Sequence, residues 1–206
     1  MSAKIIGISG SPIKDSNTDR LIKTMLEASG LEYEFVKLST KNIRPCYGCK
    51  RCVSDNICKI NDDFPVLAEK LKKADAIVIG AYTPFNLLDS FTQSLFERFW
   101  SFSHKHPQLE GKKCATILSS INPQALSTIN QYFSHKLHNR MLMDLVGQVS
   151  ITGNVPCYSC TEIDQCASGT KNRSRFPDKT YNRVEDQDDI VAQAQRIGKT
   201  LGGITQ

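Results

Sequence analysis

The chain has 206 residues, and its 26 Lys and Arg against 21 Asp and Glu give a formal net charge of +5. With 40% hydrophobic and 23% charged residues, it has the composition and length of one globular α/β domain with an insertion. The mild, interleaved charge makes no case for nucleic-acid binding. No apolar stretch is long enough for a membrane span or a signal peptide, so we expect a cytoplasmic protein without membrane association.

Short apolar runs alternate with amphipathic segments along the chain. The apolar runs predict five strands covered on both faces: Lys4–Ser9, Tyr33–Leu38, Ala76–Ala81, Cys114–Ser119 and Asp144–Thr152. The amphipathic segments predict five helices: Asn17–Ala28, a helix that Asp62 or Asp63 caps and that runs through Lys73, Asp89–Phe102, Pro123–Arg140 and Asp188–Leu201. This alternation predicts a single α/β domain, with a doubly wound five-stranded parallel sheet whose ligands bind beyond the strands' carboxyl ends.

Two segments do not fit a bare five-stranded domain. Residues 39–61 form a cysteine-rich insertion after the second strand, and residues 153–187 form a long loop after the fifth strand that holds three more cysteines. Loops of that length in a compact domain are usually functional or disordered. Because thiols stay reduced in the cytoplasm, these cysteines indicate metal binding or catalysis rather than disulfides.

The first predicted strand runs into a loop of small and hydroxyl residues, Ser9-Gly10-Ser11-Pro12, which leads to the helix start at Ser16-Asn17-Thr18. A helix N-terminus offers N–H groups and a positive dipole end to a phosphate. The loop has neither a dinucleotide-binding glycine pattern nor a P-loop lysine, so a monophosphate such as that of FMN fits it best. The alternative is an ordinary capped turn.

The strongest local signal is the spacing Cys46-x2-Cys49-x2-Cys52-x5-Cys58, which places four thiols within thirteen residues. Four thiolates suit Zn²⁺ or a [4Fe–4S] cluster. Structural zinc more often uses two separated CxxC pairs, so the compact run favours the cluster. A thioredoxin-type dithiol would need only two of these cysteines.

Three segments together resemble the iron–sulfur flavoproteins of the wider NAD(P)H-dependent FMN reductase superfamily. They are GISGSPIKDSNT (Gly7–Thr18), CYGCKRC with the following cysteine (Cys46–Cys58), and ADAIVIGAYTPF (Ala74–Phe85). The resemblance covers roughly residues 3–150. It implies a flavodoxin-like fold, FMN, a [4Fe–4S] cluster and assembly into homodimers or homotetramers.

The resemblance also implies roles for individual residues. The cluster would be ligated by Cys46, Cys49, Cys52 and Cys58. The FMN phosphate would be held by Ser9, Ser11, Ser16, Asn17 and Thr18. The flavin ring would be contacted by Tyr82, Thr83, Pro84, Phe85, Asn86 and Leu87, and by Ser119 and Asn122 in the loop after the fourth strand.

A second cysteine group, Cys157, Cys160 and Cys166, repeats the spacing of the last three cysteines of the first motif. It could hold a second cluster, zinc or a redox disulfide, or have no function. Cys114 is predicted to be a core residue. The four histidines are read as structural and Trp100 as a core or interface residue.

No residue has the pattern of a general acid, general base or nucleophile, so the candidate site residues are ligands rather than catalytic groups. We expect an oxidoreductase that passes electrons from a low-potential carrier such as ferredoxin through FMN and the cluster to a small-molecule acceptor. One alternative is an NAD(P)H-dependent FMN or quinone reductase with structural zinc. Another is a non-catalytic redox sensor.

Overall fold

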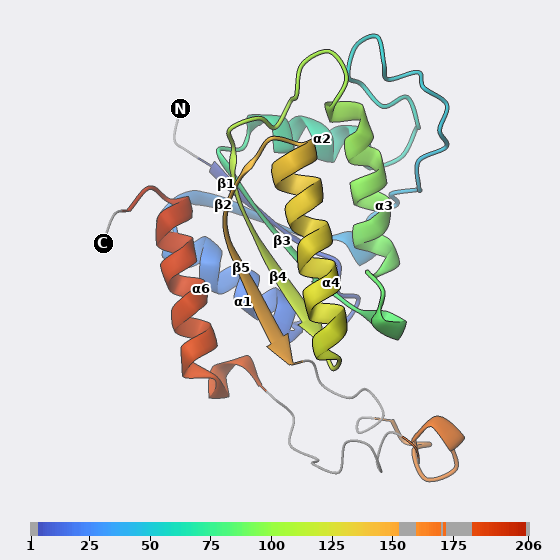
Figure 1. Ribbon diagram of the computed structural model, residues 1–206, viewed down its shortest axis with the longest axis vertical. Helices are drawn as coiled ribbons and strands as arrows, with labels where there is room; N and C mark the ends of the chain where they lie inside the picture. The colour runs from blue at the N-terminus through green and yellow to red at the C-terminus, as the bar shows by residue number, and fades with distance from the viewer. Residues whose placement is uncertain (1–3, 153–159, 170, 172–182, 205–206) are drawn as a thin grey trace.

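The sheet of the computed structural model has five parallel strands in the order β2-β1-β3-β4-β5 (Figure 1). The model describes residues 4–152, 160–169, 171 and 183–204. The strands are β1 (Lys4–Ser9), β2 (Glu32–Lys37), β3 (Ala76–Tyr82), β4 (Lys113–Ser120) and β5 (Asp144–Thr152). Their positions confirm the predicted strands to within one residue at every end.

Helices cover both faces of the sheet, which confirms the doubly wound, flavodoxin-like fold (Figure 1). They are α1 (Asn17–Ala28), α2 (Phe64–Lys73), α3 (Ser90–Arg98), α4 (Pro123–Ser134) and α6 (Asp188–Leu201). One hydrophobic core joins the sheet to α1 and α6, and another joins it to α2, α3 and α4. Burial on both sides explains why the strand sequences are continuous apolar runs rather than alternating ones.

The strand order reverses between β1 and β3, because the chain leaves β1 toward β2 but leaves β3 toward β4. This reversal is the topological switch point of the sheet, and ligands of such folds bind beside it at the carboxyl ends of the strands. These ends lie at the bottom of Figure 1, toward which the arrow of β5 points. This edge is where a ligand of such a fold binds.

Two predicted helices are shorter than their apolar patterns suggested. The segment predicted as Asp89–Phe102 is α3 followed by a 3₁₀ turn at Phe99–Phe102. Phe99 and Phe102 are both buried, and their spacing of three suits a 3₁₀ turn, in which residues three apart share one face. The segment predicted as Pro123–Arg140 is α4 followed by a π-helical turn at His135–Arg140.

The start of α2 also differs from the prediction that an aspartate caps it. Asp63 occupies the cap position, but its carboxylate accepts the N–H of Asn42 at 2.7 Å instead of a helical N–H. Asp62 accepts the N–H of Phe64 at 3.0 Å. Both aspartates therefore join the helix to the cysteine insertion. None of the described helices combines the length and apolar character needed to cross a bilayer.

Candidate functional site

The loop after β1 is held in shape by its own hydroxyl groups. Ser9 Oγ donates to Asp19 Oδ1 at 2.5 Å and accepts the N–H of Ser11 at 3.2 Å. Ser16 caps α1 by accepting the N–H of Asp19, whose carboxylate accepts the Ser16 N–H in return. Ser9, Ser11 and Thr18 are almost fully buried. These bonds fix the shape of the loop between β1 and α1.

Lys37 supports the same loop, although the sequence analysis did not single it out. Its Nζ donates to Asp19 Oδ2 at 2.6 Å and to the Ile13 carbonyl at 2.7 Å. The strand register places Lys37 beside Ser9, because β2 pairs with β1 in parallel. The ammonium group offsets the charge of Asp19, a carboxylate that would otherwise repel an anion at this helix N-terminus.

The close contact between the loop after β1 and the start of α3 depends on the absence of a side chain at Gly10. The Gly10 N–H donates to the Gly80 carbonyl at 2.8 Å and so prolongs the pairing of β1 with β3. A Cβ at Gly10 would lie 2.7 Å from Asp89 Oδ1 and still closer to Thr92 Oγ1. Close packing of the loop against the start of α3 therefore requires glycine here.

The loop after β3 presents apolar side chains to solvent at this edge of the sheet. Phe85 is 98% exposed and Leu87 is 68% exposed. Phe85 and Asn86 both have left-handed backbone conformations, with φ of 51° and 64°. Left-handed conformation is costly for a phenylalanine, and strain of this kind is concentrated at ligand-binding loops. A flat, partly apolar ring such as a flavin fits this surface.

Hydrogen bonds join the loops after β3 and β4. The Thr83 N–H donates to the Ser119 carbonyl at 3.1 Å, and Thr83 Oγ1 donates to Ser120 Oγ at 2.5 Å. Asn122 Nδ2 donates to Asn86 Oδ1 at 3.0 Å, and Asn122 also caps α4. The structure therefore brings the residues predicted to contact the flavin into one group of loops beside the loop after β1.

Asp89 joins the two ends of the loop after β3 by hydrogen bonds in the protein interior. Its carboxylate accepts the N–H of Tyr82 at 3.3 Å and that of Thr92 at 2.8 Å, and its own N–H donates to the Tyr82 carbonyl. The residue is fully buried. Burial raises the pKa of Asp89 to about 6, although the N–H groups of Thr92 and Tyr82 partly offset that effect.

This raised pKa makes folding stability depend on pH. The folded chain binds the Asp89 proton more tightly than the unfolded chain does. The stability that this protonation contributes is therefore complete below about pH 4 and is lost as pH rises through about 6. We expect the free energy of unfolding of the wild type, relative to Asp89→Asn, to fall by about 2 kcal/mol between pH 4 and pH 7. Denaturant titrations of the two apoproteins across this range measure it. A difference that does not change with pH would contradict it.

The cysteine insertion is a loop whose two ends are fastened together. Asn42 and Asp63 exchange hydrogen bonds, and the Arg44 N–H donates to Asp62 Oδ2 at 3.0 Å. Asn56 holds the far part of the loop, because it donates to the His106 carbonyl and accepts the Lys105 N–H. These bonds replace the regular secondary structure that the segment lacks.

All four cysteines of the compact motif line one hollow of about 260 Å³. Cys52 is buried, Cys46 and Cys58 are half-buried, and Cys49 is exposed. The other residues that line the hollow are Gly48, Lys50, Lys59, Ile60 and Trp100. Within the described residues, no three His, Cys, Asp or Glu side chains are grouped as closely as a single metal ion requires.

A buried ion pair lies directly behind the hollow. The side chains of Arg98 and Asp62 are both fully buried, with Arg98 Nη1 2.5 Å from Asp62 Oδ2. Arg98 Nε donates to Cys58 Sγ at 3.3 Å, and Arg98 Nη1 also donates to the Arg44 carbonyl. Burial alone would raise the pKa of Asp62, but the hydrogen bonds from Arg98 and from the Arg44 and Phe64 N–H groups lower it.

Other polar groups also contact the sulfur atoms. His104 Nε2 lies 3.3 Å from Cys52 Sγ, and the Gly48 N–H donates to Cys46 Sγ at 3.4 Å. The backbone and side chain of Arg51 lower the pKa of Cys49, whereas burial raises the pKa of Cys52. His104 therefore contacts one of the cysteines that line the hollow, which its sequence context did not indicate.

Trp100 also lies at this hollow, where it is about half exposed and lies edge-on to His104. The prediction that Cys114 is a core residue is confirmed, since it is fully buried in β4 and burial raises its pKa to about 12. Of the second cysteine group, Cys160 and Cys166 are exposed and Cys157 lies outside the described residues. The second cluster therefore stays a prediction.

The two groups of candidate residues lie at opposite ends of α3. Asp89 precedes its first turn at the strand carboxyl ends, and Arg98 ends it beside Cys58. The nine residues of α3 span about 13 Å at 1.5 Å per residue. In Figure 1 the cysteine insertion accordingly lies at the top of the molecule and the loop after β3 at the bottom.

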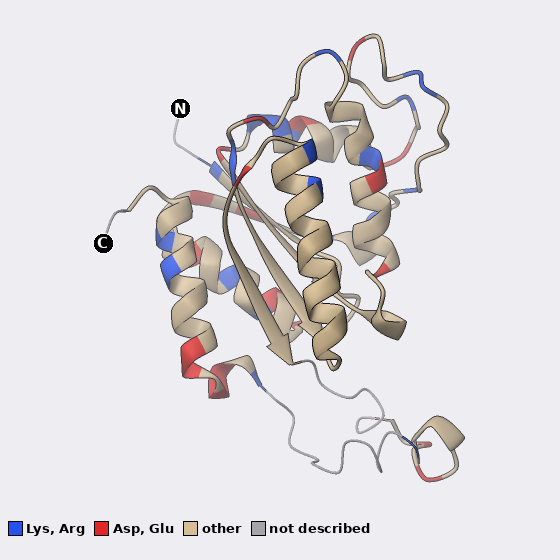
Figure 2. Cartoon of the chain, viewed as in Figure 1, with Lys and Arg blue, Asp and Glu red and all other residues tan. Residues whose placement is uncertain are grey.

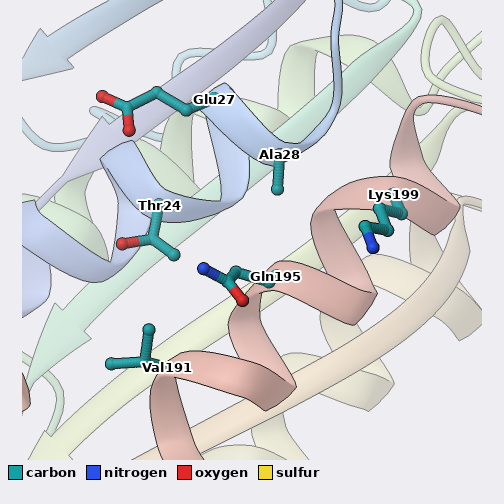
Figure 3. Close-up of a pocket in the computed structure, with 6 residues that line it drawn as sticks. All are labelled: Thr24, Glu27, Ala28, Val191, Gln195 and Lys199. Atoms are coloured by element: carbon teal, nitrogen blue, oxygen red, sulfur yellow. The ribbon is translucent and has the colours of Figure 1, made fainter. Parts of the chain in front are cut away.

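A further hollow of about 440 Å³ lies between α1 and α6 (Figure 3). Its lining comes from the second half of α1 and from α6, so it is away from the strand carboxyl ends. No cysteine lines it. Its lining mixes aliphatic, amide and oppositely charged side chains, namely Thr24, Glu27, Ala28, Val191, Gln195 and Lys199.

Solved structures with this fold include several redox enzymes. The chain superimposes on a flavone reductase with a TM-score of 0.64 and 17% identity, over 97% of this chain and 62% of that one. It superimposes on an NAD(P)H:quinone oxidoreductase from Methanothermobacter marburgensis with a TM-score of 0.63 and 16% identity, over 98% of both chains. At these identities the likeness establishes the fold alone.

Curated relatives are more similar in sequence. An iron–sulfur flavoprotein of Methanocaldococcus jannaschii is 38% identical over 98 residues, which is 46% of this chain and 51% of the relative. One of Methanosarcina thermophila is 32% identical over 117 residues, 55% of this chain and 61% of the relative. The matches thus span about half of each relative's length. A family model described as NADPH-dependent FMN reductase matches residues 3–154, and the chain therefore belongs to that family.

Proposed function

We propose that the protein is an FMN-dependent oxidoreductase that pairs FMN with a [4Fe–4S] cluster. It takes electrons from a low-potential carrier such as ferredoxin and passes them to a small-molecule acceptor. The observation that carries the proposal is that all four cysteines of the compact motif line one hollow. The FMN reductase family model supports FMN, and the names of the curated relatives, iron–sulfur flavoproteins, support the pairing with a cluster.

The strand carboxyl ends supply what FMN needs. The loop between β1 and α1 offers backbone N–H groups and a helix N-terminus for the phosphate. The exposed Phe85 and Leu87 offer an apolar surface for the ring, held by the bonds of Thr83 and Asp89. These residues bind and orient the flavin, and those bonds hold the loop in place beforehand.

The cysteine hollow fits a [4Fe–4S] cluster better than a zinc ion. Four thiolates around one zinc, with bonds of about 2.3 Å, would lie within roughly 4 Å of one another. The described cysteines are instead spread around a hollow of about 260 Å³. Cys46, Cys49, Cys52 and Cys58 would each hold one iron.

The chemistry divides between the cofactors and the chain. When bound, FMN exchanges electrons in pairs or singly and a [4Fe–4S] cluster passes them one at a time. The N–H groups of Arg98 and Gly48, and the ring of His104, contact the sulfur atoms. Hydrogen bonds and positive charge at the sulfurs stabilise the more negative, reduced state of a cluster, so these contacts would raise its potential.

The first experiment is to measure iron, acid-labile sulfide, zinc and FMN in protein purified without oxygen. We expect about four irons, four sulfides and one FMN per chain. Cys52→Ser, at the buried ligand, should lose most iron and sulfide and keep FMN. Cys114→Ala is the matched control, because Cys114 is buried in β4 and does not line the hollow.

Other outcomes would change the assignment. Zinc without sulfide would contradict the cluster and leave an NAD(P)H-dependent FMN or quinone reductase with structural zinc. Flavin reduction by NADPH but not by a reduced ferredoxin would also favour that reductase. A cluster without electron transfer to any acceptor would favour a redox sensor. Iron near eight per chain would indicate that Cys157, Cys160 and Cys166 hold a second cluster.

A further inference from the structure

A buried carboxylate lies within the loop proposed to hold the FMN phosphate. Asp19 is 2% exposed and occupies the third position of α1, where its Oδ2 accepts the N–H of the cap residue Ser16. Its Oδ1 accepts the hydroxyl of Ser9 at 2.5 Å. A helix N-terminus attracts an anion, but a second anion already placed there repels it. Phosphate binding beside Asp19 is therefore favoured only if the charge of that carboxylate is balanced.

Lys37 supplies the balancing charge from the neighbouring strand. Its Nζ lies 2.6 Å from Asp19 Oδ2, and the side chains of Lys37 and Asp19 are 17% and 3% exposed. The same ammonium group donates to the Ile13 carbonyl at 2.7 Å, within the loop. Salt screens an ion pair that is buried to this extent only weakly. Lys37 thus both cancels the charge of Asp19 and fastens the loop to the end of β2.

The other charges around the loop do not take this place. The exposed ones pair with one another, Asp15 with Arg20 and Lys23, and Glu185 with Arg20 and Arg183. Figure 2 accordingly shows both blue and red segments on α1. Lys14 is exposed in the loop itself, and the buried Asp89 accepts the N–H groups of Tyr82 and Thr92 on the side of α3. Exposed pairs contribute little, so the buried pair dominates the local charge balance.

We propose that the Asp19–Lys37 pair determines the preference of this site for a phosphorylated flavin over riboflavin, and that Lys37 is a positioning residue that acts through Asp19. The inference rests on the proposed function, in which FMN binds at the strand carboxyl ends. Asp19 joins the end of β1 to the start of α1, and Lys37 removes the repulsion between that carboxylate and a phosphate. Riboflavin has no phosphate, so its binding does not depend on this balance.

The test uses the full chain, purified without oxygen and freed of flavin, which is titrated with FMN and separately with riboflavin. Lys37→Met removes the ammonium group and keeps the side-chain length, Lys37→Arg keeps the charge, and Asp19→Asn/Lys37→Met removes both charges. Lys70→Met is the matched control, because Lys70 also forms a 2.6 Å ion pair with β2, at Glu34, which pairs with Ile6 in the middle of β1. Flavin fluorescence measures both dissociation constants, and circular dichroism checks that each variant is folded.

We expect Lys37→Met to weaken FMN binding at least about tenfold and riboflavin binding less than about twofold. The double variant should recover most of the preference for FMN, and Lys37→Arg should keep it. Lys70→Met should stay within about twofold of the wild type for both flavins. A double variant that binds FMN as weakly as Lys37→Met would overturn the inference, since Lys37 would then act through the shape of the loop alone.

Equal losses for both flavins in Lys37→Met, or no loss for either, would also overturn the inference while FMN binding and the proposed function stand. If Lys37→Met does not fold, Asp19→Asn replaces it. That variant keeps Lys37 and should bind FMN, relative to riboflavin, at least as tightly as the wild type, and a lower ratio would overturn the inference. A wild-type chain that binds neither flavin would instead remove the proposed function.

Discussion

Replacing Arg98 with methionine is expected to lower the free energy of unfolding by about 3–5 kcal/mol, because it leaves the buried carboxylate of Asp62 without its partner. Arg98 and Asp62 are both fully buried, and the guanidinium also lies over the ring of Phe64 at 4.5 Å. Loss of its bonds to Cys58 Sγ and the Arg44 carbonyl would loosen both ends of the cysteine insertion. Denaturant unfolding of the apoprotein measures the change.

Two further variants separate the causes. Arg98→Lys keeps the charge but loses the planar group that contacts Asp62, Cys58 and Arg44 together, so it should be destabilised less than the methionine variant yet bind the cluster less tightly. Arg98→Met/Asp62→Leu removes both buried charges and should recover part of the lost stability. If the double variant is as unstable as Arg98→Met, the unpaired carboxylate is not the cause.

Alanine at Gly10 is expected to weaken FMN binding by more than about tenfold and to lower stability by about 1–3 kcal/mol, as overpacking of a tight interior does. The added methyl group would meet the Asp89 carboxylate and Thr92 Oγ1, both buried and held by the start of α3. Relief of this overlap must separate the loop after β1 from α3, and this separation moves apart the two loops proposed to hold the flavin. Fluorescence titration of the apoprotein with FMN measures the affinity.

Gly111→Ala is the control, because this alanine strains the backbone but overlaps with no other atom. Gly111 has a φ of 72°, and a Cβ there would meet nothing within 4 Å. It should therefore lower stability by about 1–2 kcal/mol, through left-handed strain alone, and leave FMN affinity unchanged. If Gly10→Ala binds FMN with unchanged affinity, the proposal that the flavin lies between the loops after β1 and β3 is wrong.

Much of the fold could be predicted because burial on both faces leaves a clear pattern in the strands. The run Ala76–Ala81 is apolar throughout, and the structure places it at the centre of the sheet. Helix ends were less predictable. Phe99 and Phe102 continue the apolar pattern of α3, but that pattern cannot distinguish an α-helical turn from the 3₁₀ turn that tertiary packing selects.

The candidate site was predicted in part. The cysteine spacing predicts a shared site, and the structure brings those four cysteines around one hollow. The assignment of Ser9 and Thr18 to the phosphate stays a prediction; both side chains are buried, and Ser9 Oγ donates to Asp19. No local pattern could show this, because the partner of Ser9 is Asp19, ten residues away on α1.

The alternation of strands and helices, the hydroxyl-rich loop after β1 and the compact cysteine motif can be recognised in the sequence, since each depends on neighbours within a few residues. Which distant groups support them follows only from the folded chain. Arg98 meets Asp62 and Cys58 across 36 and 40 residues, and Lys37 meets Asp19 through the pairing of β2 with β1. A buried charge is stable only beside a partner of opposite charge. The tertiary fold, and not the local sequence, brings the two side chains of such a pair together.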